Sequence, residues 1–346
     1  MLRFLTAGES HGKALLSILE GMPAGLRVNA EKINQELKRR QQGFGRGKRM
    51  QIEKDKAQII SGLKNNITLG SPVGLCIENK DFSIEKLHRV TCPRPGHADL
   101  SGILKYGFHD ARNVLERASA RETASRVAAG AICKIFLNEF KIKINSKVLS
   151  IGGGSSFAEM KKKVQQAIDS KDTVGGIFEV VVKGLPAGLG SYTHYDKRLN
   201  GRLAQAIMSI PGIKALAFGL GFSYAFGFGS AVHDAIYYNK AKGYFRKTNN
   251  AGGIEGGISN GEDVVIRACM KPIATLLEPL DSVDINTKKP GKAAVERSDT
   301  CVVEAAGVVA EAMVAFELAG AFLDKFGSDT LSDIKINYQN YLKRIR

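Results

Sequence analysis

Tryptophan is absent from this 346-residue chain, cysteine occurs only five times, and no run of about 18 residues is entirely apolar. The missing apolar run argues against a membrane span, and the start of the chain lacks the apolar core of a signal peptide. The cysteines are far apart and form no C-x-x-C pair. A disulfide framework or a metal site is therefore not expected, and a reducing cytoplasm is the expected compartment.

Acidic residues are also scarce: 34 Asp and Glu stand against 50 Lys and Arg, which gives a formal charge of +16. Such a balance favours anionic partners. Proteins that bind nucleic acid usually concentrate their positive charge in one motif, often with aromatic residues that stack on bases. Here the basic residues are scattered and no nucleic-acid module is recognisable, so a small acidic ligand is favoured.

Glycine is plentiful, but no standard nucleotide-binding loop follows from it. Gly47-Lys48 fails as a Walker A motif because Gln42 replaces its first glycine and Arg49 follows the lysine. The other glycine-rich stretches lack the third glycine of a Rossmann fingerprint; they are Gly152-Gly153-Gly154, Gly219-x-Gly221 and Gly227-x-Gly229. A classical P-loop or Rossmann site is therefore not expected.

Hydrophobic periodicity predicts a mixture of helices and strands. Asn29 is expected to cap the first helix, and the clearest helix presents a face of small apolar residues. The predicted helices cover 29–40, 120–140, 158–168, 199–207 and 302–325, and the predicted strands cover 58–62, 73–77, 141–151, 177–182, 213–218 and 264–268. Loops are expected at 43–47, 87–100 and 251–261, and the chain ends soon after its last predicted helix. Since no linker or change of composition divides the chain, one α+β domain over 1–346 is expected.

The segment Gly8-Glu9-Ser10-His11-Gly12 allows two kinds of chemistry. Read as G-x-S-x-G, it is the nucleophile elbow of a serine hydrolase, with Ser10 as nucleophile. Alternatively, His11 is an exposed proton-handling residue held between two glycines. An elbow needs a strand before it and a helix after it, at the edge of an existing parallel sheet. Only residues 2–5 precede this motif, which argues against the hydrolase.

Five further segments carry candidate functional residues. The loop Arg94–Asp99 presents His97 beside Asp99, where a histidine can exchange protons near neutral pH, although a surface turn is the alternative interpretation. Segment 117–123 places hydroxyls and arginines at the start of the long helix, which suits an anion, while a capping box of Ser119 and Glu122 explains the same residues.

The remaining candidates lie at loop and helix ends. Arg39-Arg40 and Arg46 flank the glycine loop, where they can close over an acidic substrate or form a solvated helix end. Segment 271–275 follows a strand, and Arg297-Ser298-Asp299 precedes a helix that Asp299 can cap. Taken singly, each of these sites favours its structural interpretation, and only their combination favours function.

Three signatures occur in one order across nearly the whole chain, and with them the sequence resembles the chorismate synthases. They are Gly8-Glu9-Ser10-His11-Gly12, then Arg94-Pro95-Gly96-His97-Ala98-Asp99 with Ser119-Ala120-Arg121-Glu122-Thr123, then Arg297-Ser298-Asp299 ahead of a helix with Glu311. The stretches 251–259 and Lys271-Pro272 also match. The resemblance implies a β-α-β sandwich with helices packed between sheet layers, possible internal βααβ repeats, and a homotetramer.

The resemblance further implies a carbon–oxygen lyase of the shikimate pathway. The reaction is the anti-1,4-elimination of phosphate from 5-enolpyruvylshikimate 3-phosphate to give chorismate, and it needs reduced FMN without net redox change. The reduced flavin lends electron density to the substrate and recovers it afterwards. Either NADPH or an external flavin reductase would supply the reducing equivalents. Because the sequence has no dinucleotide-binding fingerprint, an external reductase is favoured.

Roles for individual residues follow from the same resemblance. His11 would protonate or stabilise the departing phosphate, His97 would protonate the reduced flavin, and Asp299 would help remove the second proton through the flavin ring, with Ser10 and Ser119 completing the hydrogen-bond network. The flavin-contacting positions correspond to Arg117, Ala118, Ser119, Pro211, Gly212, Gly256, Lys271, Pro272, Ile273, Ala274, Thr275 and Arg297. The positions that meet substrate or NADP correspond to Arg40 and Arg46.

The chain departs from the family pattern at two positions and in length. Ala118-Ser119 stands where two serines are usual, so one hydroxyl is missing, and Pro211-Gly212 stands where many members have Asn-Ala. The chain is also short for the family. The rival hypotheses are a serine hydrolase that uses Ser10, and a basic protein that binds nucleic acid or flavin without turnover.

Overall fold

Two four-stranded antiparallel sheets form the framework of the computed structural model, which describes residues 1–47, 53–240, 243–296 and 298–345. The first sheet has the order β1 (Arg3–Ala7), β2 (Ala14–Glu20), β6 (Val73–Glu78) and β3 (Ala57–Ile59). The second has the order β7 (Lys143–Ile151), β8 (Gly176–Lys183), β14 (Val264–Met270) and β9 (Ile213–Phe218). With the helices described next, these sheets confirm the α+β class predicted from the sequence.

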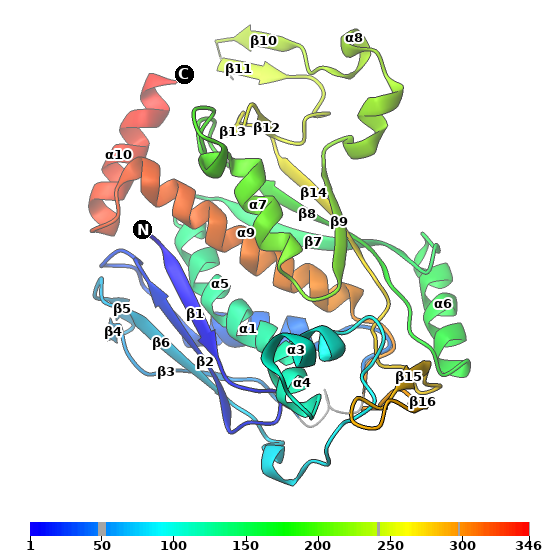
Figure 1. Ribbon diagram of the computed structural model, residues 1–346. Coiled ribbons are helices and arrows are strands. Elements are labelled where there is room, and N and C mark those ends of the chain that lie inside the picture. Colours follow the sequence, from blue (N-terminus) through cyan, green and yellow to red (C-terminus); the bar gives the residue numbers. More distant parts are fainter. Residues whose placement is uncertain (48–52, 241–242, 297, 346) are drawn as a thin grey trace.

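Helices lie between the two sheets (Figure 1). The main ones are α1 (Ala30–Gln41), α5 (Thr123–Asn138), α7 (Leu199–Met208) and α9 (Val303–Phe326). Helix α5 packs on β2 and β6 of the first sheet, whereas α9 packs on β7 and β8 of the second. The helices α5 and α9 also pack against each other, so the core runs from one sheet to the other.

The central pair of helices approaches closely because both contain small residues. A Cβ atom on Gly130 of α5 would lie 2.5 Å from the Cβ and 2.6 Å from the carbonyl oxygen of Ala312 on α9. Helix α9 has the length and apolar composition of a membrane span, but 89% of its most apolar 18-residue window is buried inside the fold. It is therefore a core helix of the fold.

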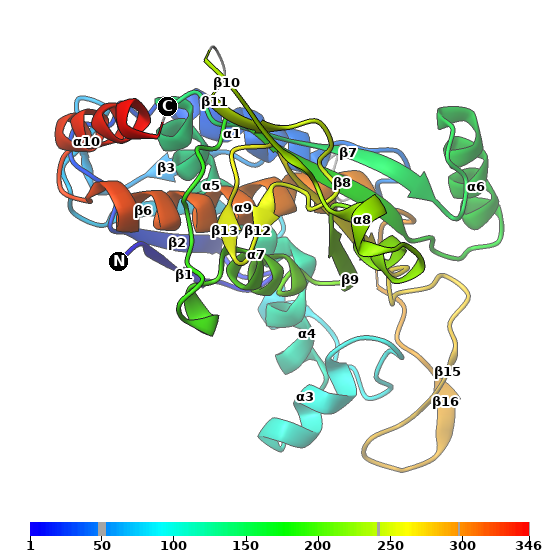
Figure 2. The ribbon, with the colours of Figure 1, turned by 90° about the horizontal axis from the view of Figure 1, so that it is seen from above.

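The remaining elements surround this framework. They are α3 (Asp99–Tyr106), α4 (Arg112–Ala118), α6 (Phe157–Asp169), α8 (Gly229–Val232), α10 (Leu331–Arg344) and the hairpins β4 (Leu63–Lys64) with β5 (Ile67–Thr68), β10 (Ile236–Asn239) with β11 (Gly243–Arg246), β12 (Ile254–Glu255) with β13 (Ile258–Ser259), and β15 (Asp281–Val283) with β16 (Pro290–Lys292). Short 3₁₀ turns occur at η1 (Ile84–Lys86), η2 (Ala120–Glu122), η3 (Tyr195–Lys197) and η4 (Gly221–Phe226). Figure 2 shows α3, α4 and the β15–β16 hairpin projecting on the same side of the molecule.

Most of the long predicted elements are confirmed, with ends that move by a few residues. Asn29 caps α1, since its side chain accepts a hydrogen bond from the main-chain nitrogen of Glu31 at 2.9 Å. The strand predicted over 58–62 is shorter and ends at Ile59, because the chain turns at Gly62, where φ is +87°. The predicted loop over 251–261 contains the β12–β13 hairpin.

The predicted start of the long helix is wrong, and several helices were not predicted. The long helix does not begin at residue 120 with a capping box, because η2 comes first and the hydroxyl of Ser119 accepts from Arg121 rather than from Glu122. Helices α3 and α4, which enclose this region, were not predicted. Nor was α10, which continues the chain after α9 and packs Tyr338 on Phe140 and Phe322.

Candidate active site

The glycine-flanked segment 8–12 connects two antiparallel strands, β1 and β2. Gly8 has φ +103°, and a Cβ atom there would lie 2.3 Å from the carbonyl oxygen of Ala14, so this tight connection needs glycine. A nucleophile elbow requires a strand that leads into a helix. Here the second element is a strand, so the serine-hydrolase interpretation of Ser10 is wrong.

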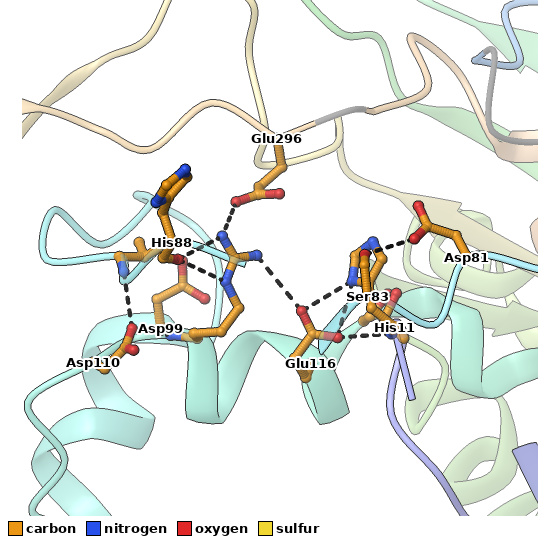
Figure 3. A network of polar contacts seen from close by, with 12 residues as sticks. His11, Asp81, Ser83, His88, Asp99, Asp110, Glu116 and Glu296 are labelled. Carbon is orange, nitrogen blue, oxygen red and sulfur yellow. Dashed lines mark hydrogen bonds and ion pairs between the residues drawn. The ribbon is translucent and has the colours of Figure 1, made fainter. Parts of the chain in front are cut away.

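His11 is buried and held by one carboxylate. Its ring Nδ1 lies 3.0 Å from both carboxylate oxygens of Glu116, and its main-chain N–H donates to the same carboxylate at 2.8 Å. Figure 3 shows the two side chains facing each other. Burial raises the pKa of Glu116, but the hydrogen bonds and charge of His11 outweigh burial, and the pKa lies below its usual value. The orientation of the His11 ring is therefore fixed through Nδ1, and the other ring nitrogen, Nε2, takes no part in the contact with Glu116.

The segment 117–119 packs directly on the turn that carries His11. Ser119 donates through its hydroxyl to the hydroxyl of Ser10 at 3.2 Å. Arg117 donates to the carbonyl oxygens of Gly8 and Thr6, both at 3.0 Å. Ala118 lies between Arg117 and Ser119 at the end of α4. The sequence motifs at 8–12 and 117–119 thus meet in space.

A cluster of buried arginines lies beside this turn. Arg40 donates to the hydroxyl of Thr123 and the carbonyl oxygen of Ala120, both at 2.9 Å, and pairs with Asp55 at 3.5 Å. Its interpretation as a solvated helix end is wrong, since the residue is 5% exposed. Burial, aided by the nearby charges of Arg121 and other arginines, lowers the pKa of Arg40 to about 10, although Asp55 opposes the shift.

Two more arginines complete the cluster. Arg121 donates to Asp55 at 2.6 Å and to Asn79 at 2.9 Å, and Arg46 pairs with Asp299 at 3.2 Å. Among the described residues, no hydrogen-bond acceptor is found for one buried nitrogen on each arginine: Arg40 Nη1, Arg46 Nε and Arg121 Nη2. Buried donors without acceptors are costly in a folded protein, and an anionic ligand would provide acceptors for them.

Asp299 belongs to the same cluster. Its carboxylate accepts a hydrogen bond from the main-chain N–H of Gly47 at 2.5 Å, in addition to its ion pair with Arg46. The alternative role of Asp299 as a helix cap is wrong, because α9 begins after Val302 and has no side-chain cap. Arg297, the other residue expected in this segment, lies outside the described residues.

His97 lies in a second group of functional candidates. Its Nδ1 is 2.5 Å from Asp99, which also accepts from the Nε atom of Arg94 at 2.8 Å. Arg94 in turn donates to the hydroxyl of Thr275 at 2.7 Å. Pro95 and Gly96 form an exposed turn, as the alternative interpretation predicted, but His97 is only partly exposed and is tied to Asp99, which is fully buried. Burial raises the pKa of Asp99, but the hydrogen bonds and charges of His97 and Arg94 lower it by more. The pKa therefore lies well below its usual range.

The segment 271–275 brings further expected residues to the His97 group. Lys271 donates through its ammonium to the carbonyl oxygen of Gly96 and through its main-chain N–H to that of Gly212 at 2.9 Å. Burial and the nearby Lys214 lower the pKa of Lys271. Pro211 and Gly212, Lys271 to Thr275 and His97 are thus brought together.

Gly256 does not join this group. It lies in the β12–β13 turn, where the carbonyl oxygen of the adjacent Gly257 accepts from the N–H of Leu199 at the start of α7 at 2.9 Å, whereas Pro211 and Gly212 follow the end of that helix. The ten residues of α7 span roughly 15 Å at 1.5 Å per residue. Within one copy of the chain, the structure therefore separates this expected flavin contact from the others.

Helix α4 links the two groups. Arg112 donates to Glu296 at 2.7 Å and lies 3.6 Å from Glu116, the partner of His11. The segment that ends at Glu296 also holds the His97 loop, since the N–H of Ala294 donates to the carbonyl oxygen of Cys92 at 3.1 Å. Figure 3 shows Glu116, Glu296 and Asp99 in this network.

Sequence reasoning missed several members of this network. Glu116 and Arg112 were not singled out because α4 was not predicted, and a helix with Arg and Glu four residues apart was the only local signal. Asp55 pairs with two arginines from distant parts of the chain, which one sequence cannot reveal.

The sequence and the fold have close counterparts among known proteins. The profile of the family described as chorismate synthase matches residues 2–323. The chain is 53% identical to the chorismate synthase of Caldanaerobacter subterraneus subsp. tengcongensis over 348 residues, covering 100% of this chain and 99% of the relative. It is 51% identical to that of Geobacter sulfurreducens over 391 residues, covering both chains fully. A chorismate synthase crystal structure matches with a TM-score of 0.82 and 42% identity, covering 99% of this chain and 98% of the other.

These matches define a class of enzyme, the carbon–oxygen lyases. The chain belongs to the chorismate synthase family.

Proposed function

We propose that this chain eliminates phosphate from 5-enolpyruvylshikimate 3-phosphate to give chorismate, the last common step of the shikimate pathway. The observation that carries the proposal is the cluster of Arg40, Arg46 and Arg121 beside His11 and Asp299. Two buried arginines and the partly buried Arg46, each with one buried nitrogen that lacks a hydrogen bond among the described residues, suit a phosphorylated, carboxylated substrate, because guanidinium groups bind both kinds of anion. Family membership identifies which anion this is.

The elimination breaks a C–O bond to phosphate and a C–H bond, and it forms a new double bond. In the proposal, His11 stabilises the leaving phosphate through Nε2, with Ser10 and Ser119 hydrogen-bonded at its side. Asp299 helps to remove the proton that the substrate loses, and its ion pair with Arg46 places the carboxylate close to the expected anionic ligand. Arg40 and Arg46 bind the substrate or, in a self-reducing enzyme, NADP.

The residues around His97 fit a bound flavin phosphate. The His97 loop and segment 271–275 contribute a buried arginine, a lysine and a histidine, which balance the charge of a polyanion. Arg117, Ala118 and Ser119 would hold the flavin together with Pro211, Gly212, Lys271 to Thr275, Gly256 and Arg297. When bound, reduced FMN supplies electron density to the substrate as phosphate leaves and takes it back afterwards. His97, oriented by Asp99, holds a proton beside this cofactor.

We further propose a homotetramer, supported by two separate apolar surfaces. On the first sheet Leu5 and Ile18 are cross-strand neighbours and are 70% and 51% exposed. In the η4–α8 segment, Phe226 and Phe228 are 90% and 87% exposed. Large exposed apolar residues in groups mark interaction surfaces, and a closed tetramer with dihedral symmetry uses more than one interface per subunit. In such an assembly, the flavin contact expected of Gly256 would come from a partner copy of the chain.

The finer features of the fold are proposed as well. Numbered along the chain, each sheet has the strand order first-second-fourth-third, and in each the fourth strand is followed by a long core helix, α5 or α9. This common order supports an internal repeat within a single domain over 1–346, arranged as a β-α-β sandwich. A cytoplasmic location is proposed from the biosynthetic role of the family.

An anaerobic assay tests the function. Purified protein is mixed with 5-enolpyruvylshikimate 3-phosphate and chemically reduced FMN, and chorismate and phosphate are followed; the control contains oxidised FMN. Turnover with reduced flavin alone supports the lyase, and NADPH added to oxidised FMN then separates self-reduction from supply by an external reductase. If folded, FMN-binding protein shows no turnover, the proposed activity is refuted for this chain.

A further inference from the structure

Glu116 contacts His11 at two places at once. The carboxylate accepts the main-chain N–H of His11 at 2.8 Å and lies 3.0 Å from ring atom Nδ1 through each of its oxygens. An ionised carboxylate can only accept hydrogen bonds. The contact therefore requires the proton of a neutral imidazole to be on Nδ1, which leaves Nε2 as the ring atom available to a substrate.

Glu116 is itself held firmly. It is 3% exposed and lies on α4, whose carbonyl oxygen at Glu116 also accepts the N–H of Ser10 at 2.9 Å. Arg112, one turn earlier on α4, lies 3.6 Å from Glu116 and donates to Glu296 at 2.7 Å. The side chain and the main chain of one helical residue thus fix both the position of the 8–12 turn and the direction of the His11 ring.

We propose that Glu116 is the positioning residue for His11: it keeps a proton on Nδ1 and aims Nε2 at the leaving phosphate, so that a second proton taken up by the ring is held on Nε2, from which it is donated to the phosphate. This inference rests on the proposed function for its effect on turnover, but the tautomer itself is independent of any reaction. The principle is that of the buried aspartate that orients the histidine of a serine protease, where loss of the carboxylate leaves the wrong tautomer.

A purely structural ion pair would predict something else. If Glu116 only joined α4 to the 8–12 turn, its removal would lower stability without favouring either tautomer of His11. Glu116→Gln distinguishes the two roles. Its amide oxygen can still accept the main-chain N–H of His11, but its NH₂ group then faces Nδ1 as a donor, which favours the opposite tautomer with the proton on Nε2.

The test uses the full chain labelled with ¹⁵N at histidine, and two-bond ¹H–¹⁵N spectra that report the tautomer of each ring. The chain has six histidines, and His11→Gln identifies the signal of His11. We expect a single Nδ1–H form for His11 in wild type and a shift towards the Nε2–H form in Glu116→Gln and Glu116→Ala. Glu122→Gln is the matched control, because Glu122 is a neighbouring buried carboxylate that bonds Thr6 and Arg126 instead.

Turnover supplies the second measurement. In Glu116→Gln, kcat should fall by roughly a hundredfold, the effect of a misplaced acid or base, while KM changes little. A His11 signal that keeps its wild-type tautomer in both Glu116 variants overturns the inference. So does a lost wild-type tautomer with unchanged kcat. If the wild type shows no elimination but the tautomer shifts as expected, the proposed function fails while the orienting contact stands.

Discussion

The close contact between α5 and α9 makes Gly130 a position where a very small change should have a large effect on stability. In Gly130→Ala, the new methyl group would lie 2.5 to 2.7 Å from the Cβ, carbonyl oxygen and Cα of Ala312. Two of these atoms belong to the backbone of α9, so relief requires the helices to move apart. Overpacking of this kind typically costs 1–3 kcal/mol, and backbone contact places this case near ~3 kcal/mol.

Helix propensity acts in the opposite direction. Alanine is favoured over glycine by about 1 kcal/mol in a helix interior, so the net loss in the free energy of unfolding should be about 2 kcal/mol. Gly320→Ala on α9 is the matched control. Its methyl group would meet the flexible end of Arg202 at 2.8 Å, with Leu2 next at 3.9 Å. Since Arg202 can rotate away, this variant should be neutral or more stable by up to about 1 kcal/mol.

Urea unfolding of both variants checks the reasoning, with equal m-values showing that the folded states are comparable. The two changes are chemically identical and both lie in core helices, so their difference, about 2–3 kcal/mol, isolates the contact with Ala312. Equal stabilities for Gly130→Ala and wild type would show that α5 and α9 have room to separate. A loss in Gly320→Ala as large as in Gly130→Ala would refute the distinction between backbone and side-chain contacts.

Three further predictions concern the site. His97→Ala and Asp299→Ala should keep the fold and some FMN affinity while turnover falls at least roughly a hundredfold; near-normal turnover removes that residue from its role. The pKa of Asp99 is depressed in the folded protein, so its ionised carboxylate stabilises the fold above the ordinary pKa of about 3.9, and this stabilisation is lost as the pH falls below that value. In urea unfolding below that pH, the free energy of unfolding of Asp99→Asn should depend less steeply on pH than that of wild type. Inorganic phosphate at about 100 times its Kd should raise the free energy of unfolding by about 2.7 kcal/mol, and Arg46→Met should lose most of this gain; an equal gain in that variant would exclude Arg46 from anion binding.

Local patterns in the sequence predict the framework well and the site only in part. The amphipathic and alternating segments that become α1, α6, α7, α9 and the strands of the second sheet carry their signal within each segment. The short helices α3 and α4 do not, because they are held by contacts with the 282–296 region and by α4's bonds to the 8–12 turn. Glu116 went unnoticed for this reason, although it lies one residue before a quoted motif.

The arginines show most clearly what one sequence cannot reveal. Arg40, Arg46 and Asp299 were expected to meet a ligand, but the family pattern alone does not explain why. The structure supplies the physical reason: Glu53, Asp55 and Asp299 pair with Arg121, Arg40 and Arg46, but among the described residues Arg40 Nη1, Arg121 Nη2 and Arg46 Nε have no hydrogen-bond partner, and the first two lie 3.5 and 3.7 Å from a carboxylate oxygen. For folding alone, hydrophobic residues of similar volume are often as good as buried ion pairs or better. The same surplus of donors favours binding of an anion, because the ligand completes hydrogen bonds that the fold leaves open. The cluster therefore lowers the stability of the free protein and raises its affinity for a phosphorylated substrate, and both effects arise from the same unsatisfied nitrogens.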